Sequence, residues 1–98
     1  MIVVITDEAE RDLETIGDNI AKDSPLRAIS FVRELRERCE GLVDMPYTFP
    51  LVPRYESCGI RRRVHGNYLI FYQVFREMIV VTHVLHGAMD YFPILFPS

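Results

Sequence analysis

The sequence predicts an α+β domain: an N-terminal strand and an αα-hairpin, then a three-stranded antiparallel meander, with the helices packed on one face of the sheet. Three observations lead to this prediction. Residues 7–43 carry apolar side chains at helical spacing, two strand-like runs flank Gly66-Asn67, and residues 78–85 form a third apolar run. A sheet this small cannot bury both of its faces alone. We therefore expect the helices to cover one face and to leave the other free for a partner.

Length and composition fit one globular domain. The chain has 98 residues, 49% of them apolar and 26% charged, and a chain of this length buries roughly two thirds of its unfolded surface. We expect a single domain over residues 1–98, in which residues 87–98 form an apolar C-terminal tail. No apolar run approaches the ~20 residues of a membrane span, and the early acidic residues do not fit a secretory signal. A cytoplasmic location is expected.

Charge is distributed unevenly along the chain. Residues 1–44 hold 11 acidic and 6 basic side chains, a balance of −5, whereas residues 45–98 hold 3 acidic and 5 basic, a balance of +2. The predicted sheet is thus the basic half. With Lys22 as its only lysine and a pI of about 5.5, the chain does not fit a protein that binds nucleic acid over its whole surface. Cys39 and Cys58 lack metal-site spacing, so neither a metal nor a disulfide is predicted.

The first half of the chain predicts a strand and two helices. Ile2–Ile5 is an uninterrupted apolar run, typical of a strand in the interior of a sheet. Thr6 and Asp7 can cap a helix that runs to about Lys22. Its apolar stripe is Ala9, Leu13, Ile16 and Ile20, and its outward face is Arg11, Asp12, Glu14 and Asp18.

A second helix follows after a very short connection. Ser24 can cap it, and Pro25 suits its first position. Its apolar stripe is Ala28, Val32, Leu35, Cys39 and Leu42. The short connection predicts that the two helices are antiparallel neighbours.

The arginine-rich segment is predicted to form a hairpin. Residues 45–57 contain three prolines and read as an ordered loop, and Gly66-Asn67 then predicts a type I′ or II′ turn between strands 60–65 and 68–74. A two-residue turn places Arg62 opposite Phe71, and it places Arg61 and Arg63 on the other face. We expect Arg61 and Arg63 to be exposed, and Arg62 to lie beside Phe71 against the helices.

Two histidines and an aromatic tail close the chain. His83 and His86 can act as general acid or base, but their separation puts them on opposite faces of a continuing strand, which favours structural roles. The aromatic side chains Tyr68, Phe71 and Tyr72 are interpreted as core. The tail, with Tyr91, Phe92, Leu95 and Phe96, either covers a groove of its own chain or forms a docking site.

Four segments occur in an order that resembles a known family. They are AERDLETIGDNIA, SPLRAISFVRELRERCEGL, GIRRRVHGNYLIFYQV and VVTHVLHGAMD. The chain resembles the ParE toxins of the RelE/ParE superfamily of bacterial toxin-antitoxin modules, from its first strand to Asp90.

This resemblance implies the toxin of a type II module that inhibits DNA gyrase and replication. A ParD-type ribbon-helix-helix antitoxin would neutralise it by direct binding, and operator DNA would be reached only through that antitoxin. The expected toxin is a stoichiometric inhibitor without cofactor, rather than an enzyme.

Two alternatives remain open: a RelE-like, ribosome-dependent mRNA endonuclease, and a non-toxic antitoxin-binding module that acts in operon autoregulation. An endonuclease needs a general acid, a general base and cations around the phosphate. The chain offers arginines, histidines and Tyr91 but no lysine after Lys22, which favours gyrase inhibition.

These considerations define the candidate sites. Target contacts are predicted at Arg61, Arg63 and His86. Antitoxin contacts are predicted at Tyr47, Phe49, Leu51, Tyr91, Phe92, Leu95 and Phe96. No catalytic residue, metal ligand or membrane contact is predicted.

Overall fold

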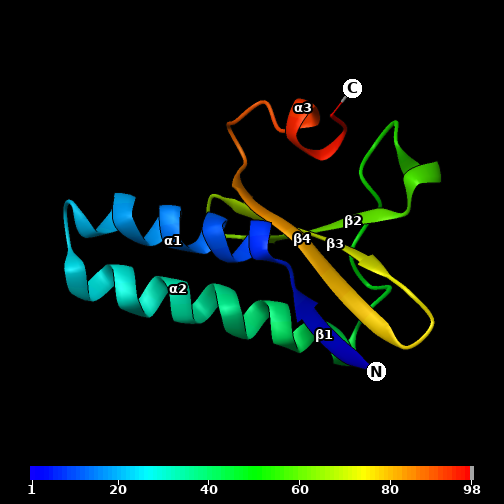
Figure 1. Cartoon of the computed structure of the whole chain (residues 1–98), viewed down its shortest axis with the longest axis horizontal. Helices are drawn as coiled ribbons and strands as arrows, with labels where there is room; N and C mark the ends of the chain where they lie inside the picture. The colour runs from blue at the N-terminus through cyan, green and yellow to red at the C-terminus, as the bar shows by residue number, and fades with distance from the viewer. Residues whose placement is uncertain (98) are drawn as a thin grey trace.

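The computed structural model of the chain describes residues 1–97 and confirms the predicted α+β fold (Figure 1). Ser98, the last residue of the predicted tail, lies outside the described residues. The elements in chain order are β1 (Ile2–Ile5), α1 (Asp7–Ala21), α2 (Pro25–Glu40), the short 3-10 helices η1 (Gly41–Asp44) and η2 (Glu56–Cys58), β2 (Ile60–His65), β3 (Tyr68–Val74), β4 (Met78–His86) and α3 (Phe92–Leu95). Within residues 1–97, no helix combines the length and apolar character that crossing a membrane requires.

The four strands form one sheet in the order β1-β4-β3-β2. β2, β3 and β4 are antiparallel neighbours with the predicted register, in which Arg62 pairs with Phe71. β1 pairs with β4 in parallel. The prediction that β1 lies in the interior of the sheet is wrong, because β1 is an edge strand. Strands favour β-branched residues in any position, so a four-residue run does not reveal whether both of its edges are paired.

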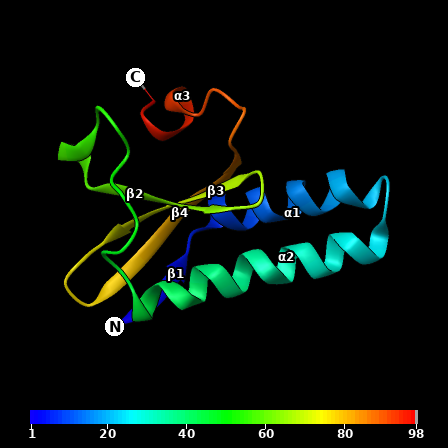
Figure 2. The same ribbon diagram turned by 180° about the vertical axis from the view of Figure 1, so that it is seen from behind.

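The antiparallel helices α1 and α2 cover one face of the sheet (Figures 1 and 2). Thr6 Oγ1 caps α1 by accepting from Ala9 N at 3.1 Å, and Ser24 Oγ caps α2 by accepting from Arg27 N at 3.2 Å. Both caps satisfy amide groups that the first helical turn leaves unpaired. The core under the helices consists of Ala9, Leu13, Ile16, Phe31, Leu35, Cys39, Leu42, Ile70, Tyr72, Ile79, Val81 and Val84.

The prediction of a free second face is wrong for most of that face, because the C-terminal tail covers it. A second core lies under the tail and consists of Val52, Ile60, Leu69, Phe71 and Leu85. Because β3 has large apolar side chains on both faces, leaving this face bare would expose residues such as Phe71 to water. The β1 end of this face stays open, with 63% of Ile2, 38% of Val4 and 40% of Met78 exposed.

Candidate interaction surfaces

Arg61 and Arg63 project from β2 towards the loop before it and the end of α2. Arg61 Nη1 donates to Phe49 O at 2.8 Å, and the guanidinium lies 5.2 Å from the Tyr47 ring centre. Arg63 Nη1 donates to Arg38 O at 3.0 Å and stacks on Phe49 at 4.7 Å. Burial lowers the pKa of Arg63. Both arginines are half-buried, so the prediction of two freely exposed arginines is only partly met.

Arg62 lies on the tail-covered face and not against the helices, which corrects the predicted orientation of the hairpin. It lies opposite Phe71 as expected, and its Nη1 donates to the Tyr91 hydroxyl at 3.1 Å. The orientation could not be read from the sequence because Leu69, Ile70, Phe71 and Tyr72 are all apolar and all buried. Alternation is absent from this run, so either face could have met the helices.

His65 on β2 and His86 on β4 both pair with Tyr68 of β3, at the hairpin end of the sheet. His65 Nε2 is 3.1 Å from Glu34 Oε1, and its ring stacks on Phe31 at 5.5 Å. Glu34 also accepts from Arg27 at 2.6 Å, and these two bonds, the one from Arg27 first, lower its pKa. His86 packs edge-on against Tyr68 at 5.1 Å. Sequence reasoning did not single out His65, because its partners come from the middle of α2.

His83 has a structural partner. Its Nδ1 is 2.9 Å from Asp12 Oδ2, and the same oxygen accepts from Val84 N at 2.9 Å. Thr6 Oγ1 donates to Thr82 O at 3.2 Å. Asp12 was expected on the outward face of its helix. Instead, α1 lies along the edge of β4 beyond Val81, where β1 no longer pairs with it, and Asp12 accepts a hydrogen bond from the free backbone N–H of Val84.

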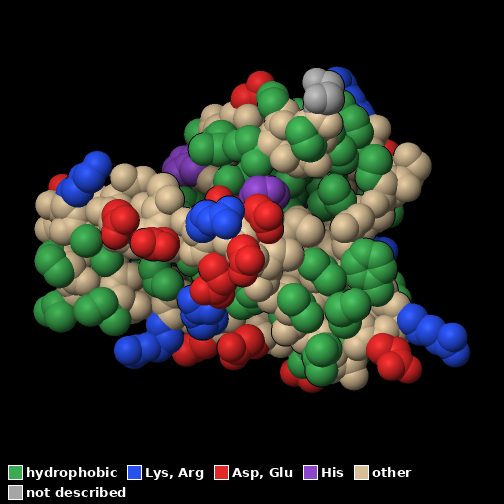
Figure 3. Space-filling model, viewed as in Figure 1, with side chains coloured by type: hydrophobic (Ala, Val, Ile, Leu, Met, Phe, Trp, Pro, Cys, Tyr) green, Lys and Arg blue, Asp and Glu red, His purple; other side chains and the backbone are tan. Residues whose placement is uncertain are grey.

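A groove of about 850 Å³ runs between α1 and α2. Its floor is formed by small and aliphatic side chains, and Gly17 allows the helices to approach closely there, because an added Cβ would lie only 3.2 Å from Val32 Cγ2. Its lining residues are Asp7, Glu10, Arg11, Leu13, Glu14, Gly17, Asp18, Ala21, Pro25, Ala28, Ile29, Val32 and Arg36. Acidic side chains gather over α1 in the space-filling view (Figure 3).

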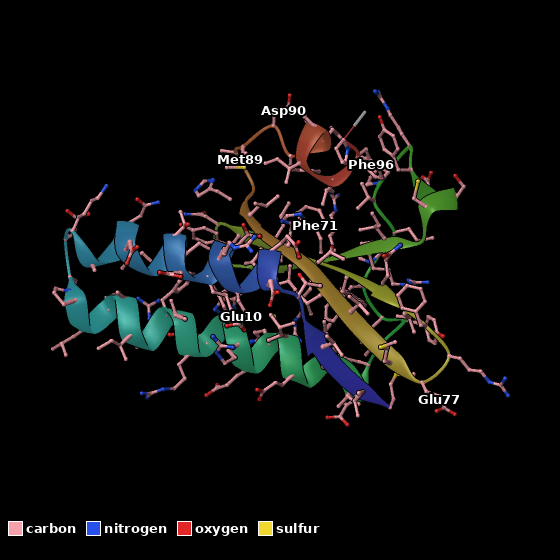
Figure 4. The ribbon with its side chains drawn as sticks, in the orientation of Figure 1. Glu10, Phe71, Glu77, Met89, Asp90 and Phe96 are labelled. Atoms are coloured by element: carbon pink, nitrogen blue, oxygen red, sulfur yellow. The ribbon has the colours of Figure 1, made fainter. Side chains whose placement is uncertain are left out.

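One ion pair crosses this groove. Arg36 donates to Glu10 through two hydrogen bonds of 2.6 and 3.2 Å, and this contact lowers the pKa of Glu10. Glu10 lies between the two helices in Figure 4. The sequence did not predict the groove. Small residues such as Gly17 and Ala28 leave space between two helices only where the helices face each other, and the sequence does not show which residues face each other.

The tail is held by aromatic packing. Tyr55 stacks on Phe96 at 4.3 Å and contacts Phe92 at 5.0 Å, and Phe71 contacts Tyr91 at 4.9 Å. Figure 4 shows the labelled Phe96 on the tail and Phe71 on the sheet below it. Within the described part of the tail, backbone hydrogen bonds of residues 91–96 stay inside the tail. Two cavities of about 480 Å³ each flank it.

The two sets of predicted antitoxin contacts lie in different places. Phe49 packs with the core under the helices, whereas Tyr91, Phe92, Leu95 and Phe96 pack with the core under the tail. Tyr47 is 65% exposed. Leu51 bridges to Arg61, so the loop occupies the outer edge of β2 at that point. The structure does not bring the two sets into one site.

The two thiols differ in their surroundings. Cys39 is buried, and burial raises the pKa of its thiol to about 12, whereas Cys58 is exposed. Among residues 1–97, no three His, Cys, Asp or Glu side chains are close enough to hold a metal ion.

Comparison with known proteins places these surfaces in context. Residues 3–91 match the family model described as the ParE toxin of the type II toxin-antitoxin system, parDE. A solved structure of the chromosomal ParDE system from P. aeruginosa is similar, with a TM-score of 0.73 and 20% identity over 88% of this chain and 95% of that chain. A chain of the RelBE2 toxin-antitoxin complex from Mycobacterium tuberculosis is also similar, with a TM-score of 0.65 and 24% identity over 90% of this chain and 92% of that chain. No curated protein sequence matches.

Proposed function

Because the chain belongs to the ParE toxin family of type II toxin-antitoxin modules, we propose that it inhibits DNA gyrase and thereby stops replication in the cytoplasm. A ParD-type ribbon-helix-helix antitoxin neutralises it by direct binding. The family match over residues 3–91 is the observation that carries this proposal. Inhibition is stoichiometric and needs no cofactor.

The division of the arginines between two faces supports gyrase inhibition over RNA cleavage. Cleavage of RNA needs an acid, a base and cations converging on one phosphate. Arg61 and Arg63 lie on one face of the hairpin and Arg62 on the other, and His83 is engaged by Asp12. These groups do not converge on one point.

One contact keeps the nuclease as a second candidate. Arg62 Nη1 and the Tyr91 hydroxyl are 3.1 Å apart, so a cation and an acid-base group do meet under the tail. In that case Arg62→Ala and Tyr91→Phe abolish cuts in translated message at the ribosome.

Target contacts are proposed at Arg61, Arg63 and His86. Each of the two arginines uses Nη1 for backbone carbonyls, and within residues 1–97 the Nη2 groups make no hydrogen bond. These free donors can bind a carboxylate or phosphate of the target. His86 lies at the hairpin end of the same face, where it contacts Tyr68.

Antitoxin contacts are proposed at the loop residues Tyr47, Phe49 and Leu51, and at the tail residues Tyr91, Phe92, Leu95 and Phe96. Because the two sets pack on opposite faces of the sheet, an antitoxin that reaches both must wrap around β2. The groove between α1 and α2, with its apolar floor and acidic rim, fits a basic amphipathic segment of the same antitoxin.

The target is tested with purified chain, gyrase and supercoiled plasmid. We expect cleavage complexes to accumulate and the antitoxin to prevent this, while message in a translation extract stays intact. Arg61→Ala with Arg63→Ala should lower the yield of cleavage complexes, and Arg33→Ala, an exposed position on α2, is the matched control. Unchanged gyrase activity at saturating protein contradicts the proposal. Normal growth during unopposed expression favours the non-toxic module.

The antitoxin contacts are tested by titration. Phe92→Asp and Leu95→Asp should weaken the complex, whereas Leu26→Asp, at a position 81% exposed on α2, should not. Circular dichroism identifies variants that fail to fold. Unchanged affinity of folded tail variants removes the tail from the interface.

A further inference from the structure

The outer edge of β1 has unpaired backbone groups. Ile2 N donates to Glu77 O at 3.2 Å and Thr6 N to Val81 O at 3.1 Å, so the even-numbered residues of β1 bond to β4. In a parallel ladder the alternate residues point the other way. The N–H and C=O groups of Val3 and Ile5 therefore face outward, and no other segment within residues 1–97 pairs with them.

β1 is short, at four residues, but no other feature of the strand protects this edge. β1 reads IVVI, without a charge, a proline or a glycine, and such features are the usual means of blocking edge-to-edge pairing. Its side chains Ile2 and Val4 are 63% and 38% exposed on the open end of the tail-side face. The opposite edge of the sheet, β2, is covered by the loop before it. Arg62 N donates to Pro50 O at 3.0 Å, and Val52 N donates to Ile60 O at 2.8 Å.

We propose that β1 pairs with β1 of a second copy of this chain, in an antiparallel register centred on Val4. In this register Val3 faces the second copy's Ile5, and the two residues exchange both of their N–H···O bonds. Symmetry repeats the exchange on the other side of Val4. The two Val4 side chains meet at the axis as a non-hydrogen-bonded pair, where side chains approach most closely.

The symmetry of the edge favours a second copy as its occupant. β1 is apolar throughout, so a second β1 offers the same unpaired backbone groups and the same apolar side chains, as an isologous interface requires. The sheet then continues through both copies, with both helix layers on the same face. On the other face Ile2 and Val4 of the two copies form one apolar strip.

One pair of opposite charges meets at each end of β1 in this arrangement. Arg76 borders the Met1 end, where it lines a surface pocket with Met1, Ile2 and the acidic Glu77, and Asp7 and Glu8 follow the other end. Figure 1 shows the turn between β3 and β4 at the start of β1, away from the start of α1. Antiparallel pairing brings Arg76 of each copy to the acidic start of α1 in the other.

This association reaches beyond inhibition and neutralisation. It occupies the edge that any strand-adding partner of β1 would need. Self-association and addition of a partner strand at β1 therefore exclude each other.

Sedimentation equilibrium of the purified chain tests the proposal. We expect a concentration-dependent species of twice the 11.4 kDa chain mass. Val4→Lys and Val4→Glu should each weaken the dimer about tenfold or more, because like charges then oppose each other at the axis. An equimolar mixture of the two variants should restore a dimer that contains one copy of each.

Two further variants complete the test. Val3→Pro removes a donor that faces outward and leaves the ladder to β4 intact, so it should abolish the dimer while the fold persists. Leu26→Lys, on an exposed position of α2, should leave the dimer unchanged. A wild-type chain that stays monomeric overturns the proposal, and so does a dimer that survives Val3→Pro. Failure of the charge-reversed mixture to pair overturns the register.

Discussion

Replacing Asp12 tests how α1 is fixed to the sheet. One carboxylate oxygen, Oδ2, accepts from Val84 N and contacts His83 Nδ1, both at 2.9 Å. Val84 is 1% exposed, so water cannot replace the lost acceptor without rearrangement. Asp12→Ala therefore leaves a buried amide unpaired and His83 without its partner.

The expected loss can be estimated from these contacts. An unsatisfied buried donor costs about 1–3 kcal/mol, and a hydrogen bond to a charged group contributes about 1.5–3 kcal/mol. The His83 contact, between side chains that are each 20% exposed, adds about 0.5–1 kcal/mol as an ordinary hydrogen bond. We expect Asp12→Ala to lower the free energy of unfolding by about 2.5 kcal/mol. Asp12→Asn, which keeps an acceptor oxygen, should cost about 1 kcal/mol.

Urea unfolding followed by circular dichroism measures this loss. With a slope of about 1.2 kcal/mol per molar urea, Asp12→Ala should move the midpoint down by about 2 M. His83→Gln, which leaves the Val84 contact in place, should cost less than about 1 kcal/mol. Glu14→Ala, on the exposed side of α1, is the control and should stay within about 0.5 kcal/mol. A loss below 0.5 kcal/mol for Asp12→Ala would refute this account of the α1–β4 junction.

Three further predictions follow from single residues. Glu10→Gln should destabilise the fold by less than about 1 kcal/mol at neutral pH, because the pair with Arg36 is partly exposed. Since the folded pKa of Glu10 lies below 4.5, this loss of stability should disappear as the pH falls through that folded pKa. Thermal unfolding of both proteins at a series of pH values measures the difference. In the native chain an excess of thiol reagent should modify Cys58 and leave Cys39 unmodified until denaturant is added, as mass spectrometry can show; equal rates would contradict the buried position. Gly66→Ala should cost about 1–2 kcal/mol in urea unfolding, because Gly66 has φ +59° in the hairpin turn; an unchanged midpoint would contradict this turn geometry.

Local signals in the sequence were sufficient for the elements and the hairpin register. Ser24-Pro25 located the start of α2, and Gly66-Asn67 located the turn, because capping and positive φ depend on residues close together in the chain. The faces of the strands could not be predicted in the same way. Alternation is absent from β3, and a β-bulge in β4 places both Val81 and Val84 towards the helices.

The candidate sites depended more strongly on tertiary structure. Asp12 sits at a position that helical periodicity assigns to solvent, and only the edge of β4 beyond β1 gives it a partner. The covering of the second face by Phe92 and Phe96 was one of two readings of an apolar tail. The tail covers the sheet because Phe71 would otherwise be exposed to water on the face away from the helices. The sequence alone does not show that Phe71 lies on that face.

The pairing of β1 with β4 bears on the order in which the chain can fold during synthesis. Ile2 pairs with Met78, which follows it by 76 residues in the chain. Closing so long a loop costs conformational entropy, which slows folding, and β1 cannot pair with β4 until β4 has left the ribosome. A ribosome adds about 5–20 residues per second, so β1 of a nascent chain stays unmatched for several seconds, until β4 has been made. A translation product that ends before β4 therefore lacks the partner of β1 and cannot complete the sheet.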